Sequence, residues 1–523
     1  MSLAEPVSTV REVEHKFRVH GLYRVPELIN ADLVSAVEDD GVLELETVYY
    51  DTPDLRLVRE GMALRRRTGG PDEGWHLKLQ VPGAEAEVRD EVRLPLDARE
   101  PQAPPEALLD LVRSVVRHSQ VHPVATLRTT RHARHVLDAS GQPAAELVDD
   151  TVQVIDGSGQ ASGQFRELEL ELAADASPEL VEHVTTQLDR SGAVTGKFVS
   201  KVVRALGPQA SAPPEVPEPD DVGPDDPASA AVQAFIALHT RAFRPSDLAF
   251  RRDPEGPFDA VHKMRVAARR MRSGLRVFRP LLDRAWADEL RDELKWAANS
   301  LGELRELEVL IARLEDRIAA LPDDTVPEDP ASTVLGRTRE QRDAARARVS
   351  VLLSSHRFLD LHERLVAAAA KPAVTEAATT PAGEALPPLV RKAWKRLAKR
   401  ANAVLDDESA LPAGAPDEEW HQARIAAKRA RYAGEAVAPV LGAEAKRFAE
   451  QMERVTEVLG EHQDAADAGT AVRAMAANAN ASASFTLGVL FAAERERVKA
   501  TRREFAKLWP KVSRRKWRRW LVT

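Results

Sequence analysis

Apolar and polar residues alternate along most of the first third of the chain, which is typical of strands with one buried face. Turn sequences such as Gly69-Gly70-Pro71 separate the alternating segments, and their spacing predicts hairpin connections. Helical patterns intervene near 104–118, 177–190 and 198–206. Long strands joined by hairpins favour an antiparallel sheet or barrel. The expected strands are 43–50, 63–68, 75–81, 87–96, 124–137, 145–155 and 164–173.

One face of these strands is charged almost throughout, whereas the other face is apolar. A single-layer sheet with a solvated charged side would explain any one strand. Six such strands, with acids on some and bases on others, favour a barrel that keeps its charged face inside and helices outside. The residues on this face are Glu12, Glu14 and Lys16; Arg65 and Arg67; His76, Lys78 and Gln80; Arg89, Glu91 and Arg93; Glu146, Val148 and Asp150; and Glu167, Glu169 and Glu171.

The interior of such a barrel has the composition that phosphoryl transfer requires. Three glutamates on one strand repel one another unless cations lie among them, and oxygen-only clusters suit Mg²⁺ or Mn²⁺. Arginine and lysine on facing strands suit a multiply charged anion, because guanidinium groups match phosphate oxygens. Acids, a divalent metal and bases together can hold a phosphate chain and position a water.

From residue 228 onward the apolar residues follow the 3.6-residue period of helices, and about eight to ten helices are expected. This part of the chain contains a repeat. The run 261–272 recurs 159 residues later as 420–431, and 301–303 recurs 158 residues later as 459–461. Two matched patches at nearly the same offset predict duplicated helical halves with pseudo-twofold symmetry.

Basic residues share one face of the repeated helix. An amphipathic helix with a solvated basic side is the usual explanation of such a stripe. A stripe without acids stores repulsion that an anion relieves, so we favour an anion-binding surface. The stripe comprises His262, Arg265, Arg269, Arg272 and Arg276 in the first copy, and His421, Arg424, Lys428 and Arg431 in the second, before Glu435 interrupts it.

Charge is distributed unevenly along the chain. The net charge is −8 overall, but −12 for residues 1–206, −6 for 207–227 and +10 for 228–523. The segment 207–227 holds seven prolines, six acids and no base, which predicts a disordered or polyproline-like linker. The absence of cysteine excludes disulfides and Cys-ligated metal sites. No segment approaches the ~18 consecutive apolar residues of a membrane-spanning helix, and no apolar secretory leader is found, so a cytoplasmic location is expected.

The motifs of the first 206 residues resemble those of the CYTH domains, the triphosphate tunnel metalloenzymes. The segment Glu12-Val13-Glu14-His15-Lys16 matches the ExExK signature of that family. The resemblance implies an eight-stranded antiparallel tunnel, dependence on a divalent metal, and triphosphate-containing substrates. Further motifs follow in the family's order: Tyr49-Tyr50-Asp51-Thr52, Ala63-Leu64-Arg65-Arg66-Arg67, Trp75-His76-Leu77-Lys78-Leu79, Arg89-Asp90-Glu91, Arg166-Glu167-Leu168-Glu169-Leu170-Glu171 and Ser200-Lys201.

This resemblance also implies roles for individual residues. The family often has Thr-Arg-Arg where this chain has Thr129-Thr130-Arg131, so one base is missing there. The implied catalytic residues are Glu12, Glu14 and Lys16. The implied metal ligands are Glu12, Glu14, Asp150 and Glu169. The implied phosphate-binding residues are Lys16, Arg65, Arg67, Lys78, Arg89, Arg131 and Lys201.

Residues 228–520 resemble the CHAD domain, a helical module that commonly follows CYTH. The specific part is the run that begins Val261-His262, and the second copy is looser. Where the family usually continues with Leu-Gly-x-x-Arg-Asp-x-Asp-Val, this chain has Glu306 and Glu308 in place of both aspartates. The resemblance implies binding of inorganic polyphosphate along a basic groove. The two histidines would pair phosphate when protonated or metal when neutral, and ordinary buried histidines are the alternative.

The sequence therefore predicts an α+β protein with an antiparallel eight-stranded tunnel at 7–206, an acidic linker at 207–227 and a duplicated all-α domain at 228–520. The main hypothesis is an enzyme, a triphosphatase that uses Mg²⁺ or Mn²⁺ to hydrolyse inorganic triphosphate or short polyphosphate in the tunnel. The helical domain would bind inorganic polyphosphate. Association with polyphosphate granules is a further expectation.

Other functions remain open at this stage. A polyphosphate-binding or granule-targeting scaffold without turnover would use the same residues. Hydrolysis of thiamine triphosphate, or a nucleotide cyclase, ranks lower because no residue indicates a pocket for a base or thiazole ring. Specific nucleic-acid binding is not expected. The tail at 511–520 combines six bases with two tryptophans, and packing of those tryptophans on the helices is its preferred explanation.

Overall fold

The structure is a computed structural model that divides into two units, Met1–Glu215 and Val216–Thr523, each described here by itself. The division falls inside the segment expected to be a linker. The last residue of the expected strand 75–81, the first residue of the expected strand 87–96 and the first residue of the helical pattern 198–206 lie outside the described residues. The structure describes residues 8–80, 88–96, 102–196, 199–254, 256, 259–321, 330–410, 415–477, 479 and 481–521.

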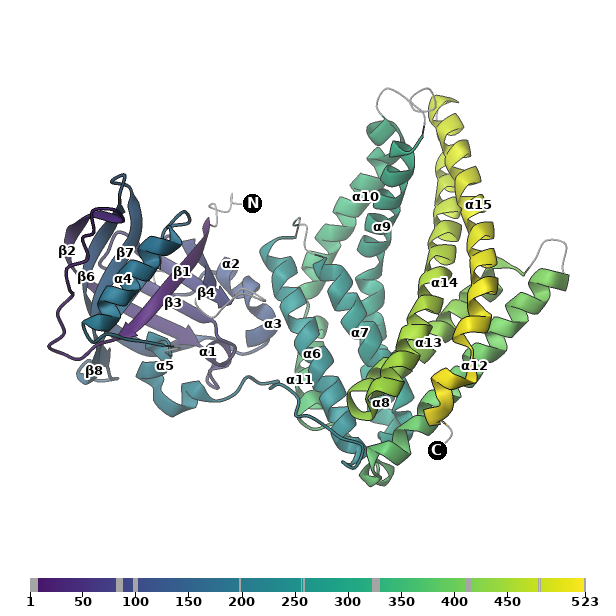
Figure 1. Cartoon of the computed structure of the whole chain (residues 1–523), viewed down its shortest axis with the longest axis horizontal. Coiled ribbons are helices and arrows are strands. Elements are labelled where there is room, and N and C mark those ends of the chain that lie inside the picture. Colours follow the sequence, from purple (N-terminus) through teal and green to yellow (C-terminus); the bar gives the residue numbers. More distant parts are fainter. Residues whose placement is uncertain are drawn as a thin grey trace. The chain divides into compact units, whose positions relative to one another are not determined.

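Eight antiparallel strands of the first unit form a closed ring (Figure 1). The order is β5-β4-β3-β2-β6-β7-β8-β1, and a β1–β5 pairing completes the ring, so the predicted tunnel is confirmed. A two-residue strand, β9 (Val194–Thr195), adds to the edge of β1. The eight strands are β1 (Ser8–Arg18), β2 (Val34–Asp51), β3 (Ala63–Thr68), β4 (Gly74–Gln80), β5 (Val88–Leu94), β6 (His122–Asp138), β7 (Pro143–Ile155) and β8 (Ala161–Leu172).

The apolar face of the ring points outward and is covered by helices. Leu180 and Leu188 of α4 (Pro178–Arg190) pack on Phe17, Leu147 and Leu168 from three strands. A second cluster joins α5 (Lys201–Leu206) to strands β2, β6 and β7. Each fully buried leucine or phenylalanine contributes ~1.5–3 kcal/mol to folding, so these contacts hold the charged face inside. Shorter helices are α1 (Arg56–Arg59), α2 (Glu106–Leu111) and α3 (Arg113–Val116).

Strand β2 differs most from expectation, because it begins nine residues earlier than the alternating pattern. Its first part is largely exposed, and its pairing with β6 is irregular between Asp39 and Val42. Gly41 has a φ of 87° there, a left-handed conformation that glycine adopts without strain. Exposure and a bulge remove the alternation on which the prediction depended.

The segment 207–227 contains one short 3₁₀-helix, η1 (Gly207–Ser211), and no other helix or strand element before α6. Its first part packs on the strand unit, where the buried Arg117 donates to Glu215 over 2.8 and 2.5 Å. Its second part packs on the helical unit, whose core includes Val216. Within this segment, all of which the structure describes, Ala210 and Val216 are buried, whereas the prolines and acids are exposed or half-buried.

The second unit is helical, as predicted, and its described residues form ten α-helices (Figure 1). The repeat aligns α7 with α13 and the start of α9 with part of α14, and α7 and α13 pack on each other. Where the first half has α8 and α9, the second has a single 34-residue helix, α14. The ten are α6 (Ala228–Arg252), α7 (Ala260–Val277), α8 (Arg284–Ser300), α9 (Gly302–Ala319), α10 (Pro330–Leu353), α11 (His356–Ala370), α12 (Ala382–Ala410), α13 (Asp417–Leu441), α14 (Ala443–Ala476) and α15 (Ala481–Val512).

The basic tail packs on the helices. Trp520 contacts Phe448 edge to face, the Arg518 guanidinium lies over Trp394, and Leu521 is buried in the core. This arrangement agrees with the structural explanation preferred above. Within the described residues, no helix combines the length and the apolar character that crossing a membrane demands.

Candidate functional site

The ring encloses a charged cavity of about 210 Å³. Side chains at alternate positions of the strands point into it, which is the face predicted from the charge pattern. Ser200 and Lys201 reach the cavity from the start of α5, which is anchored on the outside of the ring by Val202. The predicted residues that line it are Glu12, Glu14, Lys16, Arg65, Arg67, Lys78, Arg89, Arg131, Glu169 and Lys201.

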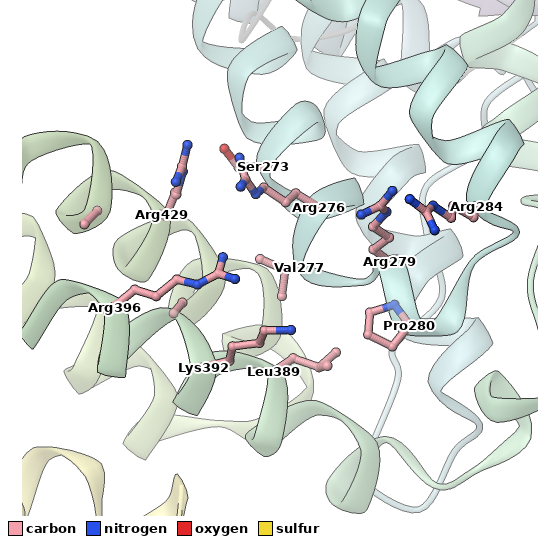
Figure 2. Close-up of a pocket in the computed structure, with 12 residues that line it drawn as sticks. Ser273, Arg276, Val277, Arg279, Pro280, Arg284, Leu389, Lys392, Arg396 and Arg429 are labelled. Carbon is pink, nitrogen blue, oxygen red and sulfur yellow. The ribbon is translucent and has the colours of Figure 1, made fainter. Parts of the chain in front are cut away.

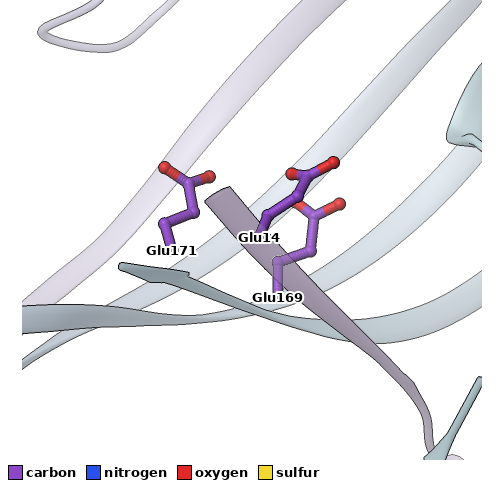
Figure 3. Close-up of side chains that lie close together, drawn as sticks. All are labelled: Glu14, Glu169 and Glu171. Atoms are coloured by element: carbon purple, nitrogen blue, oxygen red, sulfur yellow. The ribbon is translucent and has the colours of Figure 1, made fainter. Parts of the chain in front are cut away.

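Three carboxylates meet on one side of the cavity (Figure 3). Glu14, Glu169 and Glu171 each offer an oxygen within 4.8 Å of the other two. The β1–β8 register produces this cluster, because Glu14 lies opposite Glu171 and Lys16 lies opposite Glu169. Oxygen ligands at this spacing suit Mg²⁺ or Mn²⁺, so the residues fit a divalent cation. Glu171 was not among the predicted ligands, although it shares the face of Glu167 and Glu169.

Lysines compete for the same carboxylates. Lys16 donates to Glu169, and Lys201 donates to Glu169 over 2.7 Å. Burial alone would raise the pKa of Glu169, but these two lysines hold it well below its usual range. Glu171 has no such partner among the described residues, and burial raises the pKa of its carboxyl to about 7. The cluster is therefore partly neutralised by the protein itself.

The other two predicted metal ligands are engaged by bases. Glu12 accepts from Lys78 over 2.5 Å and from Arg93 over 2.8 Å. Asp150 is fully buried and accepts from Arg131 over 2.9 and 2.8 Å. The Lys201 Nζ lies 2.8 Å from the same carboxylate. The structure thus places these acids where they hold neighbouring bases of the cavity in position.

The remaining bases form the opposite wall. Arg65 pairs with the fully buried Glu91 at 3.0 Å, and Arg67 pairs with Asp72. Burial and then the charge of Arg65 lower the pKa of Arg67, which therefore gains from an additional anion. Arg89 lines the cavity, and no ion pair to it is found among the described residues.

In the helical unit, the two basic stripes meet at a groove of about 820 Å³, called here the α7–α13 groove. Its predicted members are His262, Arg265, Arg269, Arg424 and Lys428. Acids from α9 and α14 reach some of these bases. Arg265 lies 3.4 Å from Glu306. Arg424 lies 3.6 Å from Asp464.

Both histidines are half-buried. His421 contacts Gln463 over 2.7 Å. Burial and nearby arginines lower the pKa of His262, although Asp259 opposes them.

Four predicted members of the stripes, namely Arg272, Arg276, His421 and Arg431, do not line the groove. Arg276 lines a separate cavity of about 420 Å³ with Lys392, Arg396 and Arg429, as Figure 2 shows. Arg431 is engaged by acids, since it donates to Glu435 over 2.6 Å and to Glu453 over 2.5 Å. Arg272 lies between the two cavities on α7, and burial and neighbouring arginines lower its pKa.

Comparisons with known proteins agree with this architecture. Residues 10–206 match the CYTH domain family, and residues 234–473 match the CHAD domain family. The uncharacterized proteins MT2285 and Rv2226 of Mycobacterium tuberculosis are 33% and 32% identical to the chain over 502 residues, which is 92% of this chain and of each relative. The chain therefore belongs to the proteins that join a CYTH domain, of the divalent-metal-dependent triphosphate tunnel metalloenzymes, to a CHAD domain.

Solved structures give weaker likenesses. PptA from Streptomyces chartreusis is 25% identical, with a TM-score of 0.45 over 55% of this chain and 100% of that chain. The CHAD domain from the plant Ricinus communis is 24% identical, with a TM-score of 0.43 over 55% of this chain and 94% of that chain.

Proposed function

We propose that the tunnel hydrolyses inorganic triphosphate or short polyphosphate with Mg²⁺ or Mn²⁺, and that the helical domain binds long polyphosphate. One observation carries the proposal most directly. Inside a single closed ring, three carboxylates within 4.8 Å of one another face a wall of arginine and lysine. That arrangement supplies ligands for a cation and for phosphate oxygens within one cavity of about 210 Å³.

The bases of the tunnel would bind and orient the phosphate chain. Arg65, Arg67, Arg89 and Arg131 are suited to phosphate oxygens because a guanidinium donates two parallel hydrogen bonds. Glu91 and Asp150 hold two of these guanidinium groups in position before substrate arrives. Such preorganisation lowers the cost of ordering the site when the substrate binds.

Acids on the other wall would hold a divalent cation. Glu14, Glu169 and Glu171 are the ligands that the geometry favours, and Glu12 borders them. When bound, the cation neutralises phosphate oxygens and makes a bound water more acidic. A triphosphate would draw Lys16 and Lys201 away from Glu169, which releases carboxylate oxygens for that cation. Binding of cation and substrate should therefore be mutually favourable.

The α7–α13 groove would bind a linear polyanion by charge. Arg269 has no acidic partner among the described residues. Burial and then neighbouring arginines lower the pKa of Arg265, and lower that of Lys428 to about 7, because the positive charges of the groove repel one another. A phosphate chain lying between them relieves that repulsion. A polymer held there also raises the local concentration of phosphate chains near the rest of the protein.

A crossed pair of variants tests the division of labour. Glu14→Gln should abolish metal-dependent phosphate release from tripolyphosphate while leaving long-polyphosphate binding unchanged. Arg265→Glu with Arg424→Glu should weaken polymer binding while leaving tripolyphosphate turnover unchanged. Polymer affinity that survives the arginine pair would rule out the groove, and wild-type binding without any phosphate release would favour a scaffold without turnover.

A further inference from the structure

Two cavities of the helical unit are related by the internal repeat. The open pocket is the cavity of about 420 Å³ lined by Arg276, Arg279, Arg284, Lys392, Arg396 and Arg429 (Figure 2). The covered pocket, of about 460 Å³, is lined by Phe235, Leu238, Arg270, Tyr432 and Glu435. Residues of α7 and α13 correspond at an offset of 159. The helices that precede them, α6 and α12, begin 154 residues apart, at Ala228 and Ala382, and we align them at that offset. The two pockets are therefore equivalent positions in the two halves.

Their charges differ at these equivalent positions. Glu435 of the covered pocket stands where the open pocket has Arg276, and Leu238 stands where it has Lys392. In the covered pocket, Arg270 pairs with Glu435 at 3.3 Å. The equivalent base, Arg429, has no carboxylate partner among the described residues. Duplication has thus produced one neutralised pocket and one that gathers bases.

An acidic stretch of the chain itself lies over the covered pocket. Pro219, Asp220, Asp221 and Val222 line it from the segment that precedes α6. Glu218 of the same segment pairs with Arg241 at 3.1 Å. An anionic stretch of chain therefore lies on one of the two equivalent positions.

The matching stretch before α12 takes another course. Its backbone pairs with the chain between α7 and α8. The Thr375 N–H donates to the Leu281 carbonyl, and the Asp283 N–H donates to the Ala373 carbonyl, each over 2.9 Å. None of the residues that line the open pocket comes from this stretch. Among the described residues, no acidic stretch of chain lines the open pocket as 219–222 lines the covered one.

The bases of the open pocket lie close enough together that their positive charges repel one another. Burial and then the charges of Arg291 and Arg396 lower the pKa of Arg276. Burial and then Arg276 and Arg396 lower the pKa of Arg429. One carboxylate, Asp288, serves Arg279 at 2.6 Å and Arg284 at 3.9 Å. For Arg276, Lys392, Arg396 and Arg429, no acidic partner is found among the described residues.

We propose that the open pocket is a separate binding site for a compact molecule that carries several phosphate groups. Six bases around a cavity of this size match a small, densely charged anion, because phosphate oxygens accept from several guanidinium groups at once. The α7–α13 groove is larger, and its size suits a longer phosphate chain. It also differs from the open pocket in being lined by acids as well as bases. The proposal does not depend on polyphosphate binding in that groove, but it assigns Arg276 to a different site.

Binding of inositol hexakisphosphate to the full chain tests the proposal by calorimetry. Arg396→Glu with Arg429→Glu should remove one binding site or weaken it by about tenfold or more, since each lost base also adds an opposing charge. Lys399→Glu is the matched control, because Lys399 is exposed on α12 three residues from Arg396 and does not line the pocket. The groove variant Arg265→Glu with Arg424→Glu should change this site by less than about threefold.

Four results would overturn the proposal. An equal loss of inositol hexakisphosphate binding in Lys399→Glu would indicate that any nearby change of charge weakens binding. An equal loss in the groove variant would indicate that the pocket and the groove are one binding site. Tripolyphosphate that displaces inositol hexakisphosphate from this site at equal concentration would show that a compact shape is not required. Lys392→Met, at an exposed position, provides a second variant whose folding is not threatened, and it should weaken binding by several-fold. Unchanged binding in Lys392→Met would also count against the site, whereas polymer binding to the groove is judged separately.

Discussion

The tunnel and the α7–α13 groove both gather charged side chains, but they neutralise them differently. In the tunnel, bases such as Arg65, Arg131 and Lys201 each contact a carboxylate within 3.0 Å. In the groove, Arg269 has no acidic partner among the described residues, and Arg265 and Arg424 lie at 3.4 and 3.6 Å from theirs. The tunnel is closed by a ring of strands, whereas helices from both repeats line the groove.

The difference in neutralisation determines how each region can bind an anion. A ligand entering the tunnel must exchange partners with existing ion pairs, so binding depends on fit and on a cation that replaces the lost positive charge. A ligand entering the groove meets bases that already repel one another, so binding needs charge more than shape. Chemistry is therefore expected in the tunnel, and affinity for a polymer is expected in the groove.

The largest effect is expected from removing one charge of the tunnel's acid cluster. Glu169→Gln keeps the size of the side chain but removes a proposed cation ligand and the charged partner of Lys16 and Lys201. Metal-dependent phosphate release from tripolyphosphate should fall on the order of 10³-fold or more. A colorimetric phosphate assay over a range of Mn²⁺ concentrations measures this.

The matched control lies on the same ring. Glu46 is on the outer side of β2, where it pairs with Arg128 at 3.4 Å, so Glu46→Gln should leave turnover within about twofold of wild type. Turnover retained in Glu169→Gln would remove the acid cluster from the account of catalysis.

Charge reversal in the groove should have the next largest effect. Arg265→Glu with Arg424→Glu should lower the affinity for long polyphosphate by about 10²-fold and reduce its dependence on salt, as fewer counterions are released. Fluorescence anisotropy at several salt concentrations measures both quantities. Lys399→Glu with Arg473→Glu carries the same charge change at exposed positions outside the groove and should have a much smaller effect.

The groove should also respond to pH. Burial, and then the charges of Arg424 and Arg269, lower the pKa of Lys428 to about 7. Lys428 is charged below that pH, and a bound phosphate favours the charged form. Polymer affinity should therefore fall by up to about tenfold as pH rises from 6 to 8. Lys428→Arg stays charged and should lose this step, so an identical pH profile in that variant would contradict the assignment.

The same lowered pKa has a consequence for stability with a defined sign. The unfolded chain holds the Lys428 proton up to its ordinary pKa near 10, whereas the folded chain releases it near 7. The unfolded state binds more protons within this window, so this group makes folding more favourable as pH rises through it.

The smallest expected effect is a difference between Arg269 and Arg431, which the sequence places in the two equivalent basic stripes. Arg431 is held by Glu435 and Glu453, whereas Arg269 faces the groove. Arg431→Gln should change polymer affinity by less than about twofold, and Arg269→Gln should weaken it several-fold. Anisotropy titrations on the two variants side by side measure the difference, and equal losses would show that pairing with acids does not decide which bases bind.

Local patterns predicted much of the fold. Strand β3 occupies 63–68 as expected, and the charged face lies inside because its alternating partner face is apolar. The helical repeat was visible because matching residues recur at a nearly constant offset. The β1–β5 pairing that closes the ring was not visible, because it joins residues about 80 positions apart and depends on the twist of the whole sheet.

The candidate sites show the same limit. Glu171 could have been predicted as a metal ligand from the pattern of its own strand, because it lies two residues beyond Glu169 on the same face. The neutralisation of Arg431 by Glu453 could not, because the two residues come from different helices. Lys392, Arg396 and Arg429 form one pocket only through the packing of α12 and α13, which no single-helix pattern contains.

The most direct test of the account is phosphate release from tripolyphosphate by the purified full chain, with Mg²⁺ or Mn²⁺ and with EDTA, alongside Glu14→Gln. The account predicts release that requires the metal, stops with EDTA and is lost in the variant. Equal release by Glu14→Gln, or no release with either metal while polyphosphate still binds, would contradict the assignment of catalysis to the tunnel.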